Sequence, residues 1–582
     1  MDKHYDRFIP SEGPEDAAIL IVGEAGGADE HEQGRPFVGS AGDLLINVLE
    51  RNGSSRGEVR LANLCGYRPH DNKFENLLGT EALRQGVQDL HAWIAVHRST
   101  LKLIVPVGYW PLLFMTGKKG IMKWRGSILD YVNDESLKVI PTLHPAAVLR
   151  KREYYPTFDI DFKRIISDSK FPEKRLPQRE YIIDPRGFEL EEWVERLCAA
   201  EMLAVDIEAV KKSKQILCVG FAPSKDLAVC LPVHSRFAIE RILMSRAKKC
   251  YQFGSYDTTM LRLNGFQLND PAAEEINRIF WWDTMIAAHV MEPELPRSLG
   301  YLTSIYTREP YYKHSGKDSI PADDKEWGAN VNKDTLYVYN AKDCCVTYEI
   351  AEQQMVEIQE DELYVRRMNY EMEMLEVASH ISDSGMLTDM ERLGVLKEVL
   401  LDKWARKQAV LELLSGWKIN VRSPKLKLLL YDKDKMNLPA RRNREGGLTT
   451  DEDAIVSLIG FCKGKAEELK TESKKMEWEI KLSVCKLILE IRGIRQMLSN
   501  YILSKRGDDN RSRSLYKVAG TETGRWSAKS YVDGTGYNAQ TNPRDPVEVP
   551  EEYLTKPIGD ATLLGTLTNE DLIEQEEDEV AA

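Results

Sequence analysis

The chain has 582 residues, which is too long for one hydrophobic core and predicts several domains. Hydrophobic residues make up 42% and charged residues 29%, a balance typical of soluble globular proteins, and no apolar run is long enough to cross a bilayer. The formal net charge of −13 does not exclude nucleic-acid binding, because binding depends on where the basic residues cluster.

The first ten residues, MDKHYDRFIP, lack the apolar stretch of a secretory signal. The nine cysteines are scattered and form no CxxC pair, which favours reduced thiols over a disulfide framework. We therefore expect a cytoplasmic protein.

Residues 1–168 form the first predicted domain. Short apolar runs, typical of buried parallel strands, alternate in it with helical patterns such as GDLLINVLERNG. This alternation predicts a doubly wound α/β domain. The four expected strands are AAILIVG (17–23), VRLANL (59–64), LKLIVPVG (101–108) and KVIPTLH (138–144).

Three motifs of this domain place polar residues at the ends of its predicted strands, where an open α/β sheet binds ligands. The motifs are GEAGGADEHEQGRPFVGSAGDLL (23–45), NLCGYRPHDNK (63–73) and LHPAAVLR (143–150), and their residues at the strand ends are Glu24, Asn63 and His144. Gly108 stands at the end of the remaining predicted strand. The motifs resemble those of family 4 uracil-DNA glycosylases. The resemblance implies that Phe37 stacks on a flipped uracil and Asn63 reads its polar edge. It also implies that Glu30 and His144 assist cleavage of the glycosidic bond, while Glu24 lines the pocket.

The same segment departs from that family at several positions. Gly26 stands where the family has a proline, and Tyr67 stands where one iron–sulfur ligand is expected, with Cys65 two positions away. One cysteine cannot hold such a cluster, so we expect none. Three interpretations stay open: an active glycosylase, a module that senses DNA or uracil, and a structural appendage.

Residues 169–190 are expected to be a linker, followed by a second domain over 191–365. MLAVDIEA (202–209), QILCVGFAP (215–223) and DLAVCLPV (226–233) are strand patterns with little between them, which predicts an antiparallel meander. Helical patterns continue to about residue 360.

Four acidic residues and a tyrosine of this domain form an ordered set. Asp206 and Glu208 alternate along one strand and share a face, and Tyr339 and Asp343 share a face of a helix. Asp257 opens another helix between them. A solvent-facing edge strand explains most isolated DxE pairs, but carboxylates gathered on a central strand need a neutralising partner such as a divalent cation.

This ordered set resembles the acidic motifs of the DnaQ-like proofreading exonucleases, and the run WWDTMIAAHVMEPELPRSLGYL (281–302) is similar to a segment of the same family. The resemblance implies an RNase H-like fold. The resemblance implies 3′→5′ hydrolysis of DNA with two ions, Mg²⁺ or Mn²⁺, held by Asp206, Glu208, Asp257 and Asp343. In that family the tyrosine, here Tyr339, orients the attacking water. A structural or decayed site is the alternative.

Residues 366–548 are mostly long helical patterns, including one over 466–503. Several motifs resemble the thumb and the start of the palm of family A DNA polymerases, which implies that Thr523, Arg525, Asn538 and Gln540 grip the primer–template. A polar surface loop is the alternative. The motifs are EMEMLEVASHISDSGMLTD (371–389), INVRSPKLKLLL (419–430), GLTTDEDAI (447–455) and YKVAGTETGRWSAKSYVDGTGYNAQTNP (516–543).

Residues 546–582 do not resemble the catalytic motifs of that palm, and residues 549–582 read as an acidic, disordered tail. The domain order resembles replicative polymerases of large bacteriophages, for which the location is the host cytoplasm. We expect the exonuclease-bearing part of such a polymerase, with DNA as its partner and with palm and fingers from a separate polypeptide. The alternatives are a stand-alone repair protein that excises uracil and trims ends, and a non-catalytic DNA clamp.

Overall fold

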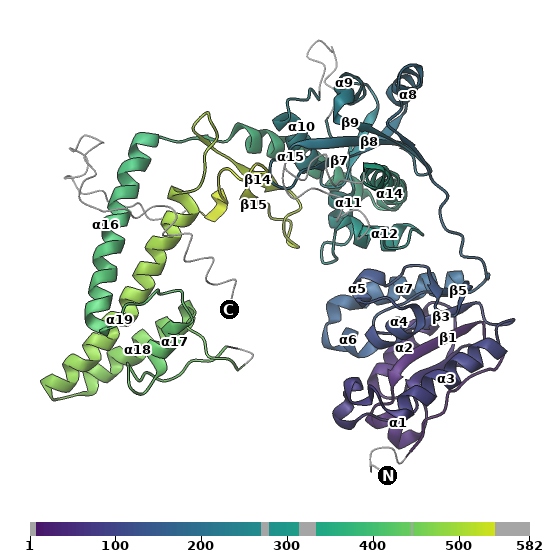
Figure 1. Cartoon of the computed structure of the whole chain (residues 1–582), viewed down its shortest axis with the longest axis horizontal. Helices are drawn as coiled ribbons and strands as arrows, with labels where there is room; N and C mark the ends of the chain where they lie inside the picture. The colour runs from purple at the N-terminus through teal and green to yellow at the C-terminus, as the bar shows by residue number, and fades with distance from the viewer. Residues whose placement is uncertain (1–6, 269–278, 314–332, 444–445, 542–582) are drawn as a thin grey trace. The chain divides into compact units, whose positions relative to one another are not determined.

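The structure is a computed structural model that describes residues 7–268, 279–313, 333–443 and 446–541 (Figure 1). The chain divides into two structural units. Unit one runs to Ser379 and includes Lys517–Ser527, and unit two comprises His380–Tyr516 with the described residues from Ala528 onward. The expected acidic tail, 549–582, lies outside the described residues. None of the described helices is long and apolar enough to span a membrane.

Unit one begins with a five-stranded sheet in the order β2-β1-β3-β5-β4. Its pairs are parallel except for β4 and β5. The strand expected over 138–144 begins earlier, because it pairs with the unpredicted β4, and it ends before Pro141. The bounds are β1 Ile19–Ala25, β2 Arg60–Cys65, β3 Leu103–Pro106, β4 Leu129–Tyr131 and β5 Asp134–Val139.

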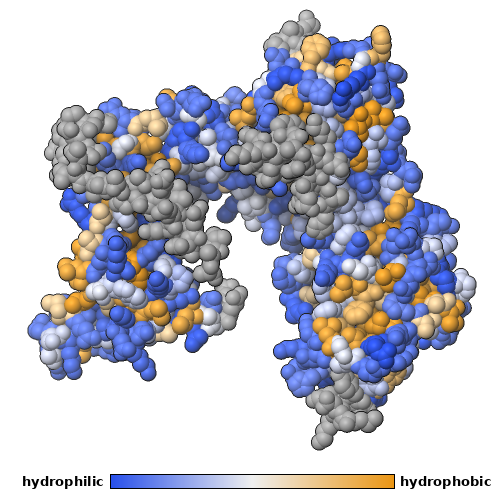
Figure 2. Space-filling model, in the orientation of Figure 1, coloured by the Kyte–Doolittle hydropathy of each residue, from blue (hydrophilic) through white to orange (hydrophobic). Residues whose placement is uncertain are grey.

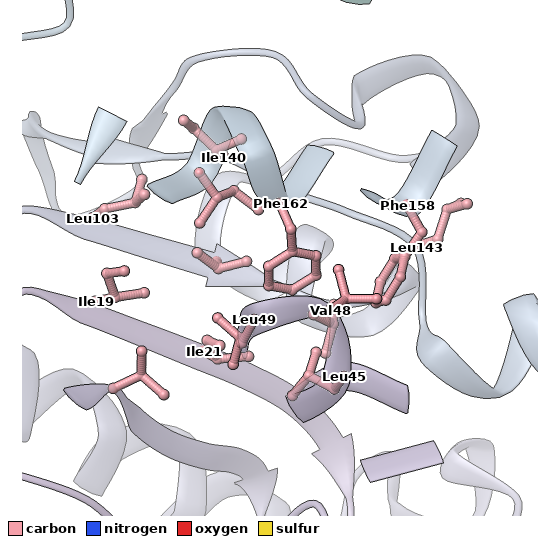
Figure 3. Close-up of a cluster of buried hydrophobic side chains, with 14 of the residues drawn as sticks. Ile19, Ile21, Leu45, Val48, Leu49, Leu103, Ile140, Leu143, Phe158 and Phe162 are labelled. Atoms are coloured by element: carbon pink, nitrogen blue, oxygen red, sulfur yellow. The ribbon is translucent and has the colours of Figure 1, made fainter. Parts of the chain in front are cut away.

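Helices cover both faces of this sheet, as the doubly wound prediction requires. Figure 3 shows one face, where side chains of α2 and α7 pack on β1 and β3. Side chains of α3 and α4 pack on the other face. The helix bounds are α1 Ala28–Gln33, α2 Ser40–Arg51, α3 Glu81–Val96, α4 Tyr109–Thr116, α5 Ile121–Trp124, α6 Pro145–Arg150 and α7 Tyr155–Asp168.

The second sheet of unit one has six strands in the order β11-β10-β7-β8-β9-β6. The antiparallel β7-β8-β9 meander confirms the prediction, whereas β6, β10 and β11 were not predicted. β6 pairs in parallel with β9, so the expected linker over 169–190 is wrong in its second half. The bounds are β6 Glu180–Ile183, β7 Met202–Ala209, β8 Ile216–Ser224, β9 Leu227–Pro232, β10 Lys248–Tyr251 and β11 Trp282–Asp283.

The long helix α14, Lys333–Gln359, packs across this sheet (Figure 1). Its buried side chains, including Cys344 and Cys345, meet those of β8 and β9 in one hydrophobic cluster. The other helices around the sheet are α8 Phe188–Cys198, α9 Arg236–Leu243, α10 Gly254–Leu263, α11 Thr284–Met291 and α12 Leu299–Tyr306.

The helix α15, Glu362–Ser384, contains the expected domain boundary at 365/366, so the boundary does not coincide with a break between elements. In unit two, the helix expected over 466–503 is interrupted at 469–471, which separates α18 from α19. These two helices pack against each other through a shared core. The bounds are α16 Met390–Ser415, α17 Lys425–Tyr431, α18 Glu452–Glu468, α19 Glu472–Met497, β12 Met386–Leu387, β13 Arg511–Ser512, β14 Ser514–Lys517 and β15 Ser527–Ser530. Hydrophilic residues cover most of the visible face of the molecule (Figure 2).

Candidate functional sites

Three carboxylates meet where β7 and α14 cross. Asp206 and Glu208 lie two residues apart on β7, and Asp343 lies on α14. One carboxylate oxygen from each lies within 4.8 Å of the other two. The local alternation of a strand therefore supplies two of the ligand groups, and a distant helix supplies the third.

Gly220 of β8 allows this close approach of the helix to the sheet. It pairs with Asp206 across the strands. A Cβ atom on Gly220 would lie 2.4 Å from Oδ1 of Asn340 and 2.6 Å from Sγ of Cys344. Asn340 in turn donates a hydrogen bond of 2.9 Å to Oδ2 of Asp206. Sequence reasoning missed both residues, although a glycine within an apolar strand signals close backbone approach.

Asp257 lies in the first turn of α10 and is buried. It does not belong to the group of three carboxylates, although Asp206 and Asp283 are near enough to raise its pKa. Asp283, which the sequence did not single out, caps α11 by accepting hydrogen bonds from the N–H groups of Met285 and Ile286. The expected fourth ligand therefore stands beside the cluster and not in its centre.

Two tyrosines and a lysine surround Asp343. Tyr312 donates a hydrogen bond of 2.5 Å to its Oδ1, and Nζ of Lys313 donates one of 2.5 Å to its Oδ2. Lys313 also donates to the hydroxyl of Tyr339 at 3.2 Å. Tyr339, the residue expected to orient water, thus lies beside the carboxylates, and sequence reasoning missed Tyr312 and Lys313.

Asp206, Glu208 and Asp257 resist ionisation. Burial, followed by the charge of Asp343, raises the pKa of Asp206 to about 8. Burial also raises the pKa of Glu208 and Asp257 well above their usual values. Buried carboxylates this close together need more positive charge than Lys313 carries, and carboxylate oxygens are the ligands that Mg²⁺ and Mn²⁺ prefer. The donor set therefore fits divalent cations.

The residues expected to grip DNA divide between the two units. Thr523 and Arg525 are exposed in a turn of unit one, where Oγ1 of Thr521 accepts a hydrogen bond of 3.0 Å from the N–H of Arg525. Asn538 and Gln540 belong to unit two, where Oδ1 of Asn538 accepts a hydrogen bond from the N–H of Gln540. All four are exposed or half-buried, which leaves them open to contact.

A pocket of about 460 Å³ lies at the ends of β1 and β2 in the N-terminal domain, and it is lined among others by Glu24, Glu30, Phe37, Asn63 and His144. Glu24 and Asn63 lie inside the last residues of their strands, not beyond them as expected. Gly23 of β1 makes room for two of these side chains, since a Cβ atom there would lie 2.3 Å from Oδ1 of Asn63 and 2.8 Å from Cζ of Phe37. The expected residues are thus brought together.

The polar groups of this pocket are not equally available. Among the described residues, Nδ2 of Asn63 is buried and has no hydrogen-bond partner. In contrast, both carboxylate oxygens of Glu30 accept backbone N–H groups, from Gly27 and from Phe37. Phe37 itself has a positive φ of 52°. Glu30 therefore holds the loop that presents Phe37, while Asn63 is free to bind a ligand.

His144 is neutral in this pocket. Burial, with a smaller contribution from Arg150, lowers its pKa to about 4. Its Nδ1 accepts a hydrogen bond from the N–H of Ala146 at 3.2 Å, which leaves Nε2 as the N–H donor. Burial raises the pKa of Glu24. His144 can therefore donate a hydrogen bond to a ligand through Nε2, but it carries no positive charge near neutral pH.

The N-terminal domain is similar to a known protein family. Residues 10–168 match the model of the uracil DNA glycosylase superfamily. A type-4 uracil-DNA glycosylase of Pyrobaculum aerophilum is 32% identical over 165 residues, which cover 26% of this chain and 78% of that protein. Through this domain the chain belongs to the uracil-DNA glycosylase superfamily.

The N-terminal segment lies close to Gly26, the position at which the resembling family has a proline. A Cβ atom on Gly26 would lie 2.1 Å from Cδ1 of Ile9, so the side chain of Ile9 occupies the space. Tyr67 packs edge-on against Phe8 with ring centroids 5.3 Å apart, and Cys65 is buried in β2. The N-terminal segment therefore packs on the positions that depart from the family pattern.

Two further comparisons extend beyond the glycosylase-superfamily domain. The DNA polymerase of Bacillus phage SP01 is 23% identical over 92% of this chain, and the chain covers 64% of that polymerase. The polymerase domain of Pol1 from M. smegmatis, solved with a DNA primer-template and dNTP, aligns with 62% of this chain and 56% of that chain at 15% identity and a TM-score of 0.43, too loose a likeness to indicate a shared fold.

Proposed function

We propose that the domain expected over 191–365 is a two-metal exonuclease that removes nucleotides from the 3′ ends of DNA. The observation that carries the proposal is the convergence of Asp206, Glu208 and Asp343 within 4.8 Å. The raised pKa values of Asp206 and Glu208 support it, because closely spaced carboxylates retain protons when no cation offsets their charge. The antiparallel β7-β8-β9 meander, continued by parallel β10 and β11, supports an RNase H-like fold.

Each residue of the site then has a role. Asp206, Glu208 and Asp343 hold the two ions, and Asp257 adds a fourth carboxylate beside them. When bound, two divalent cations clamp the scissile phosphate and lower the pKa of the attacking water. Tyr339 orients that water, and Asn340 fixes the carboxylate of Asp206 through the hydrogen bond at 2.9 Å.

The phage relative supports a role in DNA replication. Its similarity extends over 92% of the chain, so we propose that the nuclease proofreads for a family A polymerase, with Thr523, Arg525, Asn538 and Gln540 touching the primer–template. The separate palm-bearing subunit expected from the sequence stays a prediction. A stand-alone repair protein would instead digest ends without any preference for a mismatched primer terminus.

A direct assay tests the proposal. DNA labelled at its 5′ end and carrying either a paired or a mismatched 3′ terminus is incubated with the full chain in Mg²⁺ or in chelator. We expect stepwise shortening from the 3′ end that requires the metal and proceeds faster on the mismatched terminus. Products that shorten equally in chelator would contradict a metal-dependent nuclease.

Metal affinity should rise with pH. The pKa of Asp206 in the folded protein is about 8, so at neutral pH a cation must displace a proton from it. Affinity for Mn²⁺ should therefore increase by up to about tenfold per pH unit for each displaced proton, and should level off above about pH 8. Calorimetry in buffers of different ionisation enthalpy counts the released protons. Asp206→Asn should release fewer protons, and an affinity that stays constant across this range would rule out the linkage.

The pocket of the glycosylase-superfamily domain favours a second function, the binding of uracil in DNA. The observation behind it is that Nδ2 of Asn63 has no hydrogen-bond partner among the described residues and that Asn63 lines the pocket together with Phe37. An amide can pair with the edge of uracil, and an aromatic ring can stack on a base that has left the helix. Because His144 is neutral, excision should be slow or absent.

We expect single strands with one uracil to bind more tightly than those with thymine, with little abasic product. Asn63→Ala should weaken the preference by about tenfold, the value of one net hydrogen bond. Asn76→Ala, outside the pocket, is the matched control. Equal affinities for both strands with no abasic product would leave a structural role, whereas rapid excision lost in His144→Ala would make the domain a true glycosylase.

A further inference from the structure

A segment of unit one connects the glycosylase-superfamily domain with the carboxylate cluster. We call residues 305–313 the strap. On the side of the glycosylase-superfamily domain, Arg164 of α7 donates hydrogen bonds of 2.9 Å to the carbonyl of Ile305 and 2.7 Å to that of Thr307. The same guanidinium donates to the carbonyl of Gly126. One side chain thus ties the start of the strap to a loop and a helix of the N-terminal domain.

Further contacts follow along the strap. The N–H of Tyr311 donates a hydrogen bond of 3.2 Å to Oγ of Ser127, and its ring packs edge-on against Trp124. Just before the strap, Oγ of Ser304 accepts a hydrogen bond of 2.8 Å from the buried Arg125. The strap is therefore held by the N-terminal domain over most of its length.

The middle of the strap is held from the side of the second sheet. Glu309 is buried and accepts charged hydrogen bonds from Nε of Arg179 at 3.2 Å and from Nζ of Lys342 at 2.9 Å. Lys342 lies on α14, one residue before Asp343. The strap is thereby fixed to the helix that carries a proposed metal ligand.

The end of the strap enters the carboxylate cluster. Tyr312 and Lys313 both donate hydrogen bonds to Asp343, and the side chain of Lys313 is only 13% exposed. Two divalent cations would balance the three clustered carboxylates together with Asp257, which would leave the negative charge of a phosphate without a partner. Lys313 forms an ion pair with Asp343, and an ammonium group can move between a carboxylate and a phosphate on its flexible stem.

We propose that Lys313 binds the phosphate at the 3′ end of DNA in the exonuclease site, and that the glycosylase-superfamily domain positions it there through the strap. This inference rests on the proposed nuclease function. Lys313 is then a catalytic residue and Arg164 a positioning residue. The glycosylase-superfamily domain contributes to nuclease activity even where it excises no base.

The first experiment compares Lys313→Met and Lys313→Arg with the parent full-length chain. Lys313→Met should lower kcat/KM for a single strand by about 100-fold, the usual cost of removing a group that stabilises a developing charge. Binding of Mn²⁺ in the absence of DNA should not weaken, because Lys313 competes with the ion for Asp343. Lys313→Arg should recover most of the activity. An unchanged kcat/KM in Lys313→Met, or weaker Mn²⁺ binding, would overturn the catalytic role.

The second experiment asks whether the domain contact acts through Lys313. Arg164→Gln should lower kcat/KM by about 10- to 100-fold, since small displacements of a reacting group are costly. In the double variant with Lys313→Met the two losses should not add. Lys163→Gln, an exposed neighbour on α7, is the matched control and should behave like the parent. Additive losses, or no effect of Arg164→Gln, would overturn the positioning role.

These outcomes are separable from failure of the nuclease proposal itself. If the parent chain digests no DNA in Mg²⁺ or Mn²⁺, the nuclease function is wrong, and the inference about Lys313 falls with it. If the parent digests DNA and loses activity with the carboxylates but not with Lys313→Met, the nuclease stands and only the inference is wrong.

Discussion

Replacing Asp206 and Glu208 together with alanine should abolish metal-dependent digestion of DNA. The two side chains share one face of β7, and their oxygens lie within 4.8 Å of each other and of Asp343. Without them a single carboxylate of the group remains, which cannot hold two cations. We expect the rate on a 5′-labelled single strand to fall by at least about 1,000-fold.

The same double variant should not lose stability in chelator. Removing the half-buried carboxyl group of Asp206 and the buried one of Glu208 relieves repulsion and desolvation, so the melting temperature of the variant should match or exceed that of the parent. The control is Glu201→Ala with Asp226→Ala, which removes the same charge from exposed positions near the ends of the strands. Digestion by the Asp206 and Glu208 variant at the parental rate would exclude this site as the nuclease.

Arg125→Met should strongly destabilise the glycosylase-superfamily domain. The side chains of Arg125 and Asp161 form an ion pair in which each is only 1% exposed. Removing the arginine leaves Asp161 with a hydrogen bond of 2.8 Å from Thr142 and the charge of the nearby Arg164. Breaking a buried ion pair by removing one partner costs about 3–5 kcal/mol of unfolding free energy, and we expect a loss toward the lower end of that range.

Native-state hydrogen exchange of the β1 and β3 amides in the full chain measures this loss without requiring a single unfolding transition for the whole protein. Arg125→Met combined with Asp161→Leu should recover much of the stability, because an apolar pair avoids the buried charge. A loss below about 1 kcal/mol in Arg125→Met would mean that Asp161 finds another partner or takes up a proton.

The sequence indicates parts of both sites through local patterns. The face shared by Asp206 and Glu208 follows from the two-residue period of a strand, and that of Tyr339 and Asp343 from the turn of a helix. Both periods are local, so the sequence indicates them without a fold. The glycosylase motifs are similarly local, because each places its polar residue at or near the end of a strand.

Several short strands were not predicted from the sequence, because they lack a local pattern. β4, β6, β10 and β11 have two to four residues, too few to show a period, and each is stabilised by a partner strand. The segment expected as a linker contains β6 because β9 offers an unpaired edge to it. Pairing across the sheet decides such elements, and composition does not.

By itself the sequence determined which residue types carry the chemistry, the α/β order of the N-terminal domain and the β7-β8-β9 meander. Only the tertiary structure decided which residues meet. Asn340 reaches Asp206 across 134 residues because Gly220 has no side chain between them. Lys313 reaches Asp343 because the strap is fixed on both sides, and Asp257 stands beside the cluster because α10 begins there. These contacts depend on packing between segments that are distant in the chain, and such packing leaves no periodic pattern in the local sequence.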